Sequence, residues 1–194
     1  MNHWINTLSA ILLAGTTTGA ALAQAPAGST KQRTPAPVAG EPAQTTASYG
    51  DWVVRCVRVG DGPTAPRTCE VAQTLVLQGQ QQPVAQIAIG SLNNAGALHF
   101  TVALPIAISF AKVPQVTTEG ANLRPLDLAW RRCLPGGCFA EVSLSEDALK
   151  TLRTRATSAR LTFRDAGEHD VALPFSLRGF SQALDALAKE TSTR

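Results

Sequence analysis

The sequence predicts an all-β domain of the sandwich or barrel type, on three observations. Apolar and polar residues alternate through many short runs, most clearly at 97–104, where Leu98, Phe100, Val102 and Leu104 share one side of a strand. Turn signals rich in glycine, asparagine and proline separate these runs. The runs follow one another at short intervals, which disfavours a fold in which strands alternate with long helices.

Eight strands and two helices are expected from this pattern. The strands are expected at 52–57, 68–77, 84–89, 98–104, 126–130, 138–144, 160–164 and 171–177. The first helix is predicted at 143–155, with Ser143 or Ser145 as N-cap, acidic residues in its first turn and basic residues toward its end. The second helix is predicted at 179–190. Its apolar face consists of Phe180, Ala183, Leu184 and Leu187.

The first 23 residues are typical of a signal peptide. An apolar run at 5–14 is followed by small residues and by Ala21-Leu22-Ala23, which matches the A-x-A pattern of signal peptidase sites. The run is about half the ~20 residues needed to cross a bilayer, so no retained transmembrane helix is expected. We therefore predict an exported, periplasmic protein that starts at Gln24, with outer-membrane association or secretion as further options.

One domain follows a linker. Residues 24–48 are rich in Ala, Pro, Thr and Gly and have almost no large apolar side chains, so this segment is predicted to be a disordered linker. The folded domain is expected at 49–190, and 191–194 is expected to be a tail. A chain of 194 residues is long enough for one sizeable core.

The charge pattern excludes a nucleic-acid-binding protein. The formal net charge is only +3, and basic and acidic residues are interspersed along the chain. A nucleic-acid binder would instead show clustered Lys and Arg together with aromatic platforms.

The four cysteines are interpreted as structural. In an exported protein an even number of cysteines usually forms disulfides, and the pairing of neighbours in sequence joins Cys56 to Cys69 and Cys133 to Cys138. A zinc site would need a second pair at similar spacing, which is missing. A redox dithiol usually has Cys-x-x-Cys at a helix N-terminus, whereas this second pair flanks a Pro-Gly-Gly turn. A thiol-disulfide enzyme that uses Cys133 and Cys138 is kept as an alternative.

The residues reveal no catalytic site. The segment "SFAK", from Ser109 to Lys112, matches the S-x-x-K motif of penicillin-interacting serine enzymes, but it lies in a β-like run and follows the segment that would be the second motif. His99 falls on the polar side of a strand and His169 in a charged turn, so both are predicted to be solvated. We expect no catalytic residue, no metal ligand and no cofactor, and thus no enzyme.

Three blocks of the chain resemble the invasion-associated locus B family of Gram-negative bacteria. These are "YGDWVVRC" at 49–56, "CLPGGCFAEV" at 133–142 and "LPFSLRGFSQAL" at 173–184. The resemblance implies an exported, disulfide-bonded, immunoglobulin-like β-sandwich without known catalytic activity, in a family named for host-cell invasion. The segment 105–113 departs from the family, whose members tend to carry glycines there.

Four residues of these blocks are singled out as structural. Trp52 is predicted to be a core anchor above a disulfide, with ligand binding as the alternative. Phe139 belongs to the Cys-Phe-Ala block. Gly179 is expected to let the chain pass from a strand into the last helix at close range, and Phe180 is expected to fill the core.

The function predicted from these observations is that of a non-enzymatic interaction module of the cell envelope. Its partner would be an unknown protein, either in the envelope or on a host cell. The alternatives are the thiol-disulfide enzyme and a purely structural periplasmic protein.

Overall fold

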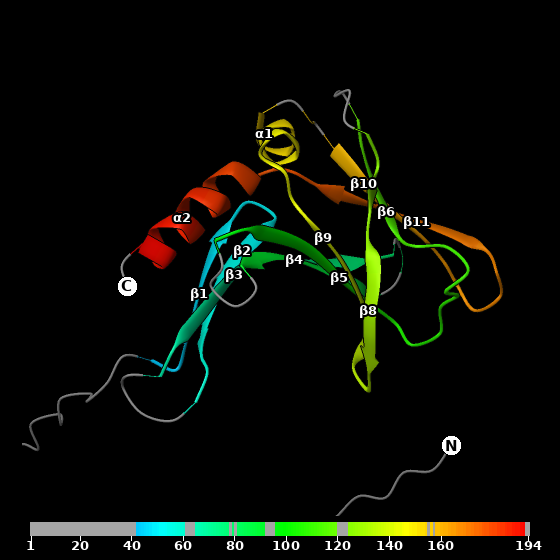
Figure 1. The fold of residues 1–194 in the computed structure, drawn as a ribbon, viewed down its shortest axis with the longest axis horizontal. Coiled ribbons are helices and arrows are strands. Elements are labelled where there is room, and N and C mark those ends of the chain that lie inside the picture. The colour runs from blue at the N-terminus through cyan, green and yellow to red at the C-terminus, as the bar shows by residue number, and fades with distance from the viewer. Residues whose placement is uncertain are drawn as a thin grey trace, which may run out of the picture. The chain divides into compact units, whose positions relative to one another are not determined.

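The computed structural model is a two-sheet β-sandwich with two helices among its described residues (Figure 1). The predicted all-β sandwich with two helices and two disulfides is therefore confirmed. The predicted signal peptide and most of the predicted linker lie outside the described residues. These comprise 42–60, 65–77, 79, 81–91, 96–119, 124–154, 156 and 158–192.

The larger sheet has seven strands in the order β1-β2-β3-β4-β5-β9-β8, and all neighbours are antiparallel. Its strands are β1 (Gln44–Tyr49), β2 (Trp52–Arg58), β3 (Arg67–Val76), β4 (Pro83–Ser91), β5 (Leu98–Leu104), β8 (Ala129–Leu134) and β9 (Gly137–Ser143). The smaller sheet has the order β11-β10-β6-β7 and is also antiparallel. Its strands are β6 (Gln115–Glu119), β7 (Leu126–Asp127), β10 (Ser158–Arg164) and β11 (Asp170–Ser176).

The core lies between the inner faces of the two sheets. Period-two alternation places every second residue of β2 and β5 inside, so that Trp52 and Phe100 are almost fully buried. Both rings meet Phe175 of β11, at centroid distances of 6.4 Å and 6.2 Å. Each large apolar side chain that is fully buried stabilises the fold by about 1.5–3 kcal/mol.

The two helices lie near the amphipathic segments predicted for them. Helix α1 (Glu146–Thr154) starts after Ser145, whose hydroxyl oxygen accepts a hydrogen bond from the Ala148 N–H at 3.2 Å. Ser145 is thus the N-cap, and Ser143 belongs to β9. Helix α2 (Phe180–Ser192) contacts β1, β2 and β3, and it buries the four residues of its predicted apolar face. The predicted tail is wrong at 191–192, because α2 continues through Ser192.

Strand β1 corrects the predicted start of the domain. Residues 44–48, predicted to be part of the linker, belong to β1 and pair with β2 along its whole length. Most side chains of β1 are exposed, so hydrophobic periodicity could not reveal it. The strand forms because backbone hydrogen bonds to β2 satisfy its polar groups at the sheet edge.

The predicted strand at 126–130 is in fact two strands in different sheets. Leu126–Asp127 forms β7 of the smaller sheet, and β8 of the larger sheet begins at Ala129. Leu128 lies between them and is fully buried, so the chain changes sheets around one core residue. Strand β6 was also missed, since Val116 is its only fully buried side chain.

Two disulfides join residues that face each other on neighbouring strands. Cys56 on β2 is bonded to Cys69 on β3, and Cys133 on β8 is bonded to Cys138 on β9. These are the pairs that closeness in sequence favours. Each bond closes a short loop within one hairpin.

Removal of the second disulfide is expected to destabilise the domain moderately. Cys133→Ser should lower the free energy of unfolding by about 2 kcal/mol, because the unfolded chain loses the constraint of a short loop. Cys138→Ser and the double variant should give the same loss, since the two residues form one bond. Urea denaturation of the three variants measures this, and a double variant much less stable than either single one would contradict it.

Candidate functional site

The opening and closing sequence blocks meet at one junction. Arg178 donates from Nε and Nη2 to the two carboxylate oxygens of Asp51, with an Nε–Oδ2 distance of 3.1 Å. The Asp51 N–H donates to the Arg178 carbonyl at 3.1 Å. Gly179 has φ +84°, and a Cβ there would lie 2.0 Å from the Tyr49 carbonyl oxygen. The backbones of the two blocks therefore touch, and only glycine fits at this contact.

Trp52 lies below this junction and has no exposed surface. Its indole N–H donates to the Ser176 carbonyl at 2.9 Å, and its ring lies 4.9 Å from the ring of Phe180. The buried side-chain amide of Gln73 donates to the carbonyls of Asp51 and Ser176 at 3.0 Å and 3.3 Å. Trp52 thus contacts the core and not solvent, so a ligand has no access to it in this conformation. The junction ties the two ends of the domain together.

The junction is charged at its surface. Hydrogen bonds from Arg178 and, to a smaller extent, from Ser176 lower the pKa of Asp51 from 3.8 to about 2. A carboxyl group whose pKa is lower in the folded state than in the unfolded state stabilises the fold at any pH above the unfolded-state pKa. This stabilisation is lost as the pH falls through the folded-state pKa.

The Asp51→Asn variant is therefore expected to show a pH-dependent stability difference from the wild type. Above about pH 4 the variant should be less stable, because its amide lacks the charge that attracts Arg178. The difference should shrink as the pH falls toward 2, where the wild-type carboxylate becomes protonated. Urea denaturation at pH 7 and pH 2.5 measures this, and a difference that does not change with pH would contradict it.

The cysteines offer no thiolates in this structure. Cys56, Cys69 and Glu190 are the one group of three potential metal ligands found among the described residues, but the two sulfurs are bonded to each other. The Cys133–Cys138 disulfide joins the paired strands β8 and β9.

The polar residues considered for catalysis are engaged in local contacts. The Ser109 hydroxyl donates to Glu168 Oε1 at 2.5 Å and accepts from the Ala111 N–H at 3.2 Å. The bond from Ser109, followed by that from Arg164, lowers the pKa of Glu168. Ser109 thus ties the loop at 105–114 to the β10–β11 turn.

The two histidines differ in their exposure. His169 is exposed, as predicted, and its Nδ1 lies 3.2 Å from Asp165 Oδ2. His99 is more buried than predicted, with 22% of its side-chain surface exposed. Its Nδ1 lies 3.9 Å from Glu141 Oε1 and makes no hydrogen bond to a described residue.

Phe139 lies apart from the other motif residues. It is half-buried on the outer face of β9, opposite Ala103 of β5. It lines a shallow hollow of about 200 Å³ on the outer face of the larger sheet. The adjacent residues Cys138 and Ala140 point into the core, so the Cys-Phe-Ala block alternates between the two faces.

The loop at 105–114 carries exposed apolar side chains and contacts Trp130 of strand β8. We define the loop–hairpin surface as Ile106, Phe110 and Val113 of the loop together with the half-buried Trp130 of β8, whereas Leu134, which pairs with Gly137, lies on the opposite face of β8. Ile106 is 67% exposed and Phe110 56% exposed. The rings of Phe110 and Trp130 lie 4.9 Å apart in an edge-to-face arrangement. Sequence reasoning missed this surface, although its signal was present as a glycine-free apolar segment between two strands.

The loop is held in a defined conformation. Its Ser109 N–H donates to the Arg164 carbonyl at 3.0 Å, and the Ala166 N–H donates to the Ala107 carbonyl at 3.3 Å. Ile108 is buried and forms an isolated β-bridge with Asp165. Anchoring of Ile108 and Ser109 leaves their flanking apolar side chains facing solvent.

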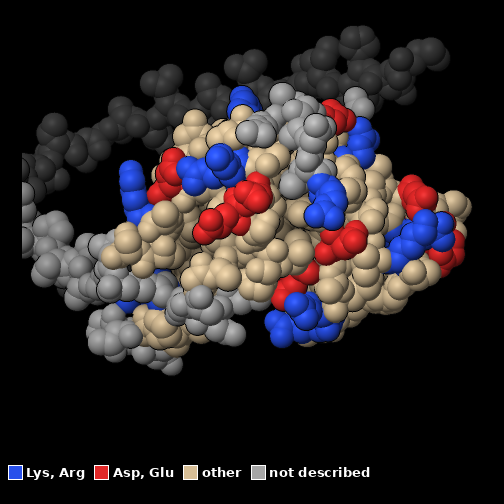
Figure 2. Space-filling model, turned by 45° about the horizontal axis from the view of Figure 1, so that its top comes forward, with Lys and Arg blue, Asp and Glu red and all other residues tan. Residues whose placement is uncertain are grey.

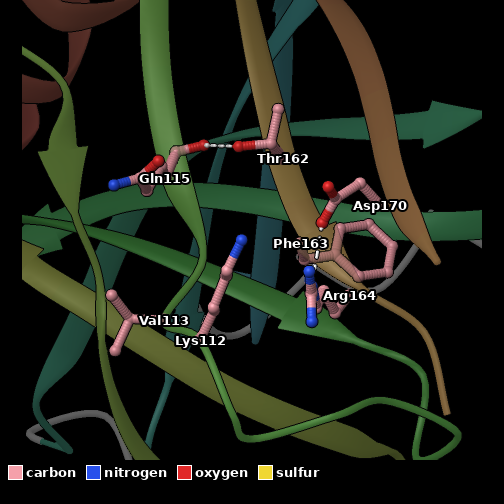
Figure 3. A pocket seen from close by; sticks show the side chains of 7 residues that line it. All are labelled: Lys112, Val113, Gln115, Thr162, Phe163, Arg164 and Asp170. Carbon is pink, nitrogen blue, oxygen red and sulfur yellow. Dashed lines mark hydrogen bonds and ion pairs between the residues drawn. The ribbon is translucent and has the colours of Figure 1, made fainter. Parts of the chain in front are cut away.

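A groove of about 540 Å³ borders the loop–hairpin surface (Figure 3). Lys112, Val113 and Gln115 line it from the loop and β6, and residues of β10 and β11 form the opposite wall. Figure 3 shows the Lys112 side chain extending into the groove, while Arg164 on the far wall is bonded to Asp170 at 3.0 Å. The groove is thus lined mostly by polar and charged side chains, with Val113 and Phe163 as its apolar part.

The surface charges are mixed. On the face drawn in Figure 2, basic and acidic side chains are interspersed and form no extended patch of one sign. No helix in the described part of the chain is both long enough and apolar enough to cross a membrane.

Comparisons with known proteins agree with the three sequence blocks. The family model described as invasion associated locus B (IalB) protein matches residues 52–188. Two curated relatives, each an "Invasion protein B homolog" of Brucella abortus, from strain 2308 and from biovar 1 strain 9-941, are 27% identical over 145 residues. Each alignment covers 72% of this chain and 77% of the relative.

A solved structure has a similar fold. The crystal structure of invasion associated protein B from Bartonella henselae superimposes with a TM-score of 0.63 at 23% sequence identity. The match covers 77% of this chain and 98% of the other. With the family model spanning most of the sandwich, the chain belongs to the invasion associated locus B family.

Proposed function

We propose that this protein is an exported, non-enzymatic binding module of the cell envelope, and that the loop–hairpin surface is its contact face. The observation that carries the proposal is the grouping of large exposed apolar side chains around the Phe110–Trp130 pair. Single exposed apolar residues are ordinary, but a group of them on one surface is typical of an interaction site.

Export to the periplasm is supported by two independent features. The N-terminal residues have the pattern of a signal peptide. Both disulfides are of the kind that persists in an oxidising compartment. The relatives are named as invasion proteins, which favours a role at the envelope or at a host-cell surface.

A binding role is favoured over catalysis by the state of the reactive side chains. The cysteines are joined in pairs, and Ser109 and His169 contact neighbouring carboxylates in turns. Among the described residues these contacts stabilise local structure, and the carboxylate beside Ser109 is a weak base because the pKa of Glu168 is lowered.

Site-specific photo-crosslinking in intact cells tests the proposal. A photoreactive benzoylphenylalanine is placed at Phe110, and a matched control is placed at Val76, which is 53% exposed at the end of β3. We expect an adduct with an envelope component from position 110 and none from position 76. Equal labelling from both positions, or none from 110, would contradict the contact face.

A second measurement separates the binding module from the thiol-disulfide enzyme. The exported protein is titrated with Ellman's reagent under denaturing, non-reducing conditions, and its insulin reductase activity is assayed. We expect no free thiol and no turnover. Turnover that disappears in Cys133→Ser would establish the enzyme and remove the proposal.

A further inference from the structure

We infer that strand β1 pairs with β1 of a second copy of this chain, so that the larger sheets of two molecules join into one continuous sheet. Strand β1 lies at an edge of the larger sheet: it pairs with β2 on one side, and no described strand lies on its other side (Figure 1). Such an edge presents backbone N–H and C=O groups to which a further strand can bind.

The free backbone groups of β1 belong to alternate residues. The Arg58 N–H donates to the Ala43 carbonyl at 2.9 Å, so residue 43 directs its backbone groups to β2. Hydrogen bonds to one neighbour recur at every second residue of an antiparallel strand. The odd-numbered residues of β1 therefore bond to β2, and Gln44, Thr46 and Ser48 direct their N–H and C=O groups to the free edge. The register with β2 is unbroken along β1, so these groups form a regular row.

The other edge strands that the structure describes each have a feature that hinders the pairing of a further strand. Strand β8 shifts its register between Trp130 and Arg132. Strand β11 contains Pro174, which has no N–H to donate. Strand β7 has only two residues. Strand β1 has six residues, none of them charged and none a proline, so it is the open edge of the described domain.

A second copy of β1 fits this edge. Antiparallel pairing about a two-fold axis at Thr46 places Thr46 opposite itself, and Gln44 opposite Ser48 of the second copy. The residues that face one another are uncharged, and a pair of threonines is a favourable cross-strand contact. Because β1 is the one open edge among the described strands, the pairing closes at two molecules and leaves no such edge exposed.

The charged side chains near β1 do not oppose this pairing, because they already have partners. The ion pairs of this region are Arg67–Glu190, Arg55–Glu70 and Asp51–Arg178. Arg67 also donates to the Thr45 hydroxyl oxygen at 2.5 Å, and both Arg58 and Lys189 have interactions as well. Helix α2 contacts β2 and β3 as well as β1, so it lies over this end of the sheet rather than along its free edge.

The expected dimer is weak and independent of the proposed contact face. Pairing of one six-residue strand buries less than the ~1,600 Å² of a standard interface, and we expect a Kd of about 10–100 μM. Trp130 lies on β8, at the opposite edge of the larger sheet. Pairing through β1 therefore leaves the loop–hairpin surface uncovered, and a failure of this inference would not remove the proposed function.

Sedimentation equilibrium of the oxidised, exported protein at about 5–500 μM tests the inference, and we expect a reversible monomer–dimer equilibrium. Thr46→Lys should weaken dimerisation about fivefold or more, because two like charges would face each other across the two-fold axis. Thr46→Glu should do the same. An equimolar mixture of the two variants should restore dimerisation to within about twofold of the wild type, since opposite charges then face each other.

Thr74→Lys and Thr74→Glu are the matched controls. Thr74 is an exposed threonine of β3, which has a strand on each side, so both variants should dimerise as the wild type does. A protein that is monomeric at all concentrations overturns the inference. Equal dimerisation by Thr46→Lys and the wild type, or no recovery in the mixture, also overturns it. Thermal unfolding curves show whether a variant folds as the wild type does.

Hydrogen exchange provides a measurement that needs no substitution. The amides of Thr46 and Ser48 face the free edge, so they should exchange about threefold or more slowly at about 500 μM than at about 5 μM. The amides of the odd-numbered residues of β1 already bond to β2 and should change little. Exchange of Thr46 and Ser48 that does not depend on concentration would overturn the inference.

Discussion

Gly179→Ala is expected to lower the free energy of unfolding by about 3 kcal/mol or more. At φ +84° an L side chain is strained, and the added Cβ would lie 2.0 Å from the Tyr49 carbonyl oxygen and 2.8 Å from the Gly50 nitrogen. All of these are backbone atoms, so no side-chain rotation can relieve the overlap. The contact of the opening and closing blocks must therefore open.

A second glycine separates the steric effect from the conformational one. Gly79 has almost the same φ, +83°, but nothing lies within 4 Å of a Cβ built there. Gly79→Ala should cost only about 1–2 kcal/mol, the strain of a left-handed residue. Urea denaturation of both variants measures the difference, and equal losses would show that the contact with Tyr49 has no energetic weight.

Trp52→Ala is expected to lower the free energy of unfolding by about 3–5 kcal/mol. The side chain is fully buried, and its ring contacts Phe175 of the smaller sheet and Phe180 of helix α2. Truncation leaves a cavity at the point where the larger sheet, the smaller sheet and α2 meet. It also leaves the Ser176 carbonyl without the indole hydrogen bond.

Trp130→Ala provides the comparison, since Trp130 is only half-buried at the margin of the core, where it contacts Phe110. Its loss should cost about 1 kcal/mol. Guanidinium denaturation followed by far-UV circular dichroism measures both variants, because this signal does not depend on the tryptophan removed. If Trp130→Ala were the more destabilising of the two, the assignment of Trp52 as the core anchor would be wrong.

Strands with one buried face and one exposed face could be predicted from the sequence. Strand β5 buries Phe100, Val102 and Leu104 on the side that alternation predicted, because each core residue is followed by one that faces out. The same holds for α2, whose four buried residues recur at helical spacing. In both cases the spacing of apolar residues along the chain indicates which side chains are buried.

Elements that depend mainly on backbone hydrogen bonds could not be predicted from hydrophobic periodicity. Strand β1 exposes most of its side chains and depends on hydrogen bonds to β2, which no local pattern encodes. The change of sheet at Leu128 looked like one continuous strand, since a buried residue on either sheet gives the same signal. The segment from Ser109 to Lys112 was interpreted as a β-like run, but the structure has only an isolated β-bridge at Ile108 in this loop, because its apolar residues are exposed rather than paired within a sheet.

The candidate contact face illustrates the same division. Each of its apolar residues is visible in the sequence, but Phe110 and Trp130 meet only because the chain returns from β6 and β7 into β8. The Asp51–Arg178 ion pair likewise joins residues 127 positions apart. Such proximity is a property of the closed fold and not of any segment.

The sequence alone determined the all-β class, the two helices and a disulfide arrangement between neighbours, because periodicity and short loops are local properties of a chain. Only the tertiary structure decided the edge strand β1, the sheet change at Leu128, the junction at Gly179 and the loop–hairpin surface. These features arise where distant backbone segments come into contact, and the free energy of such contacts depends on the closed fold rather than on neighbours in sequence.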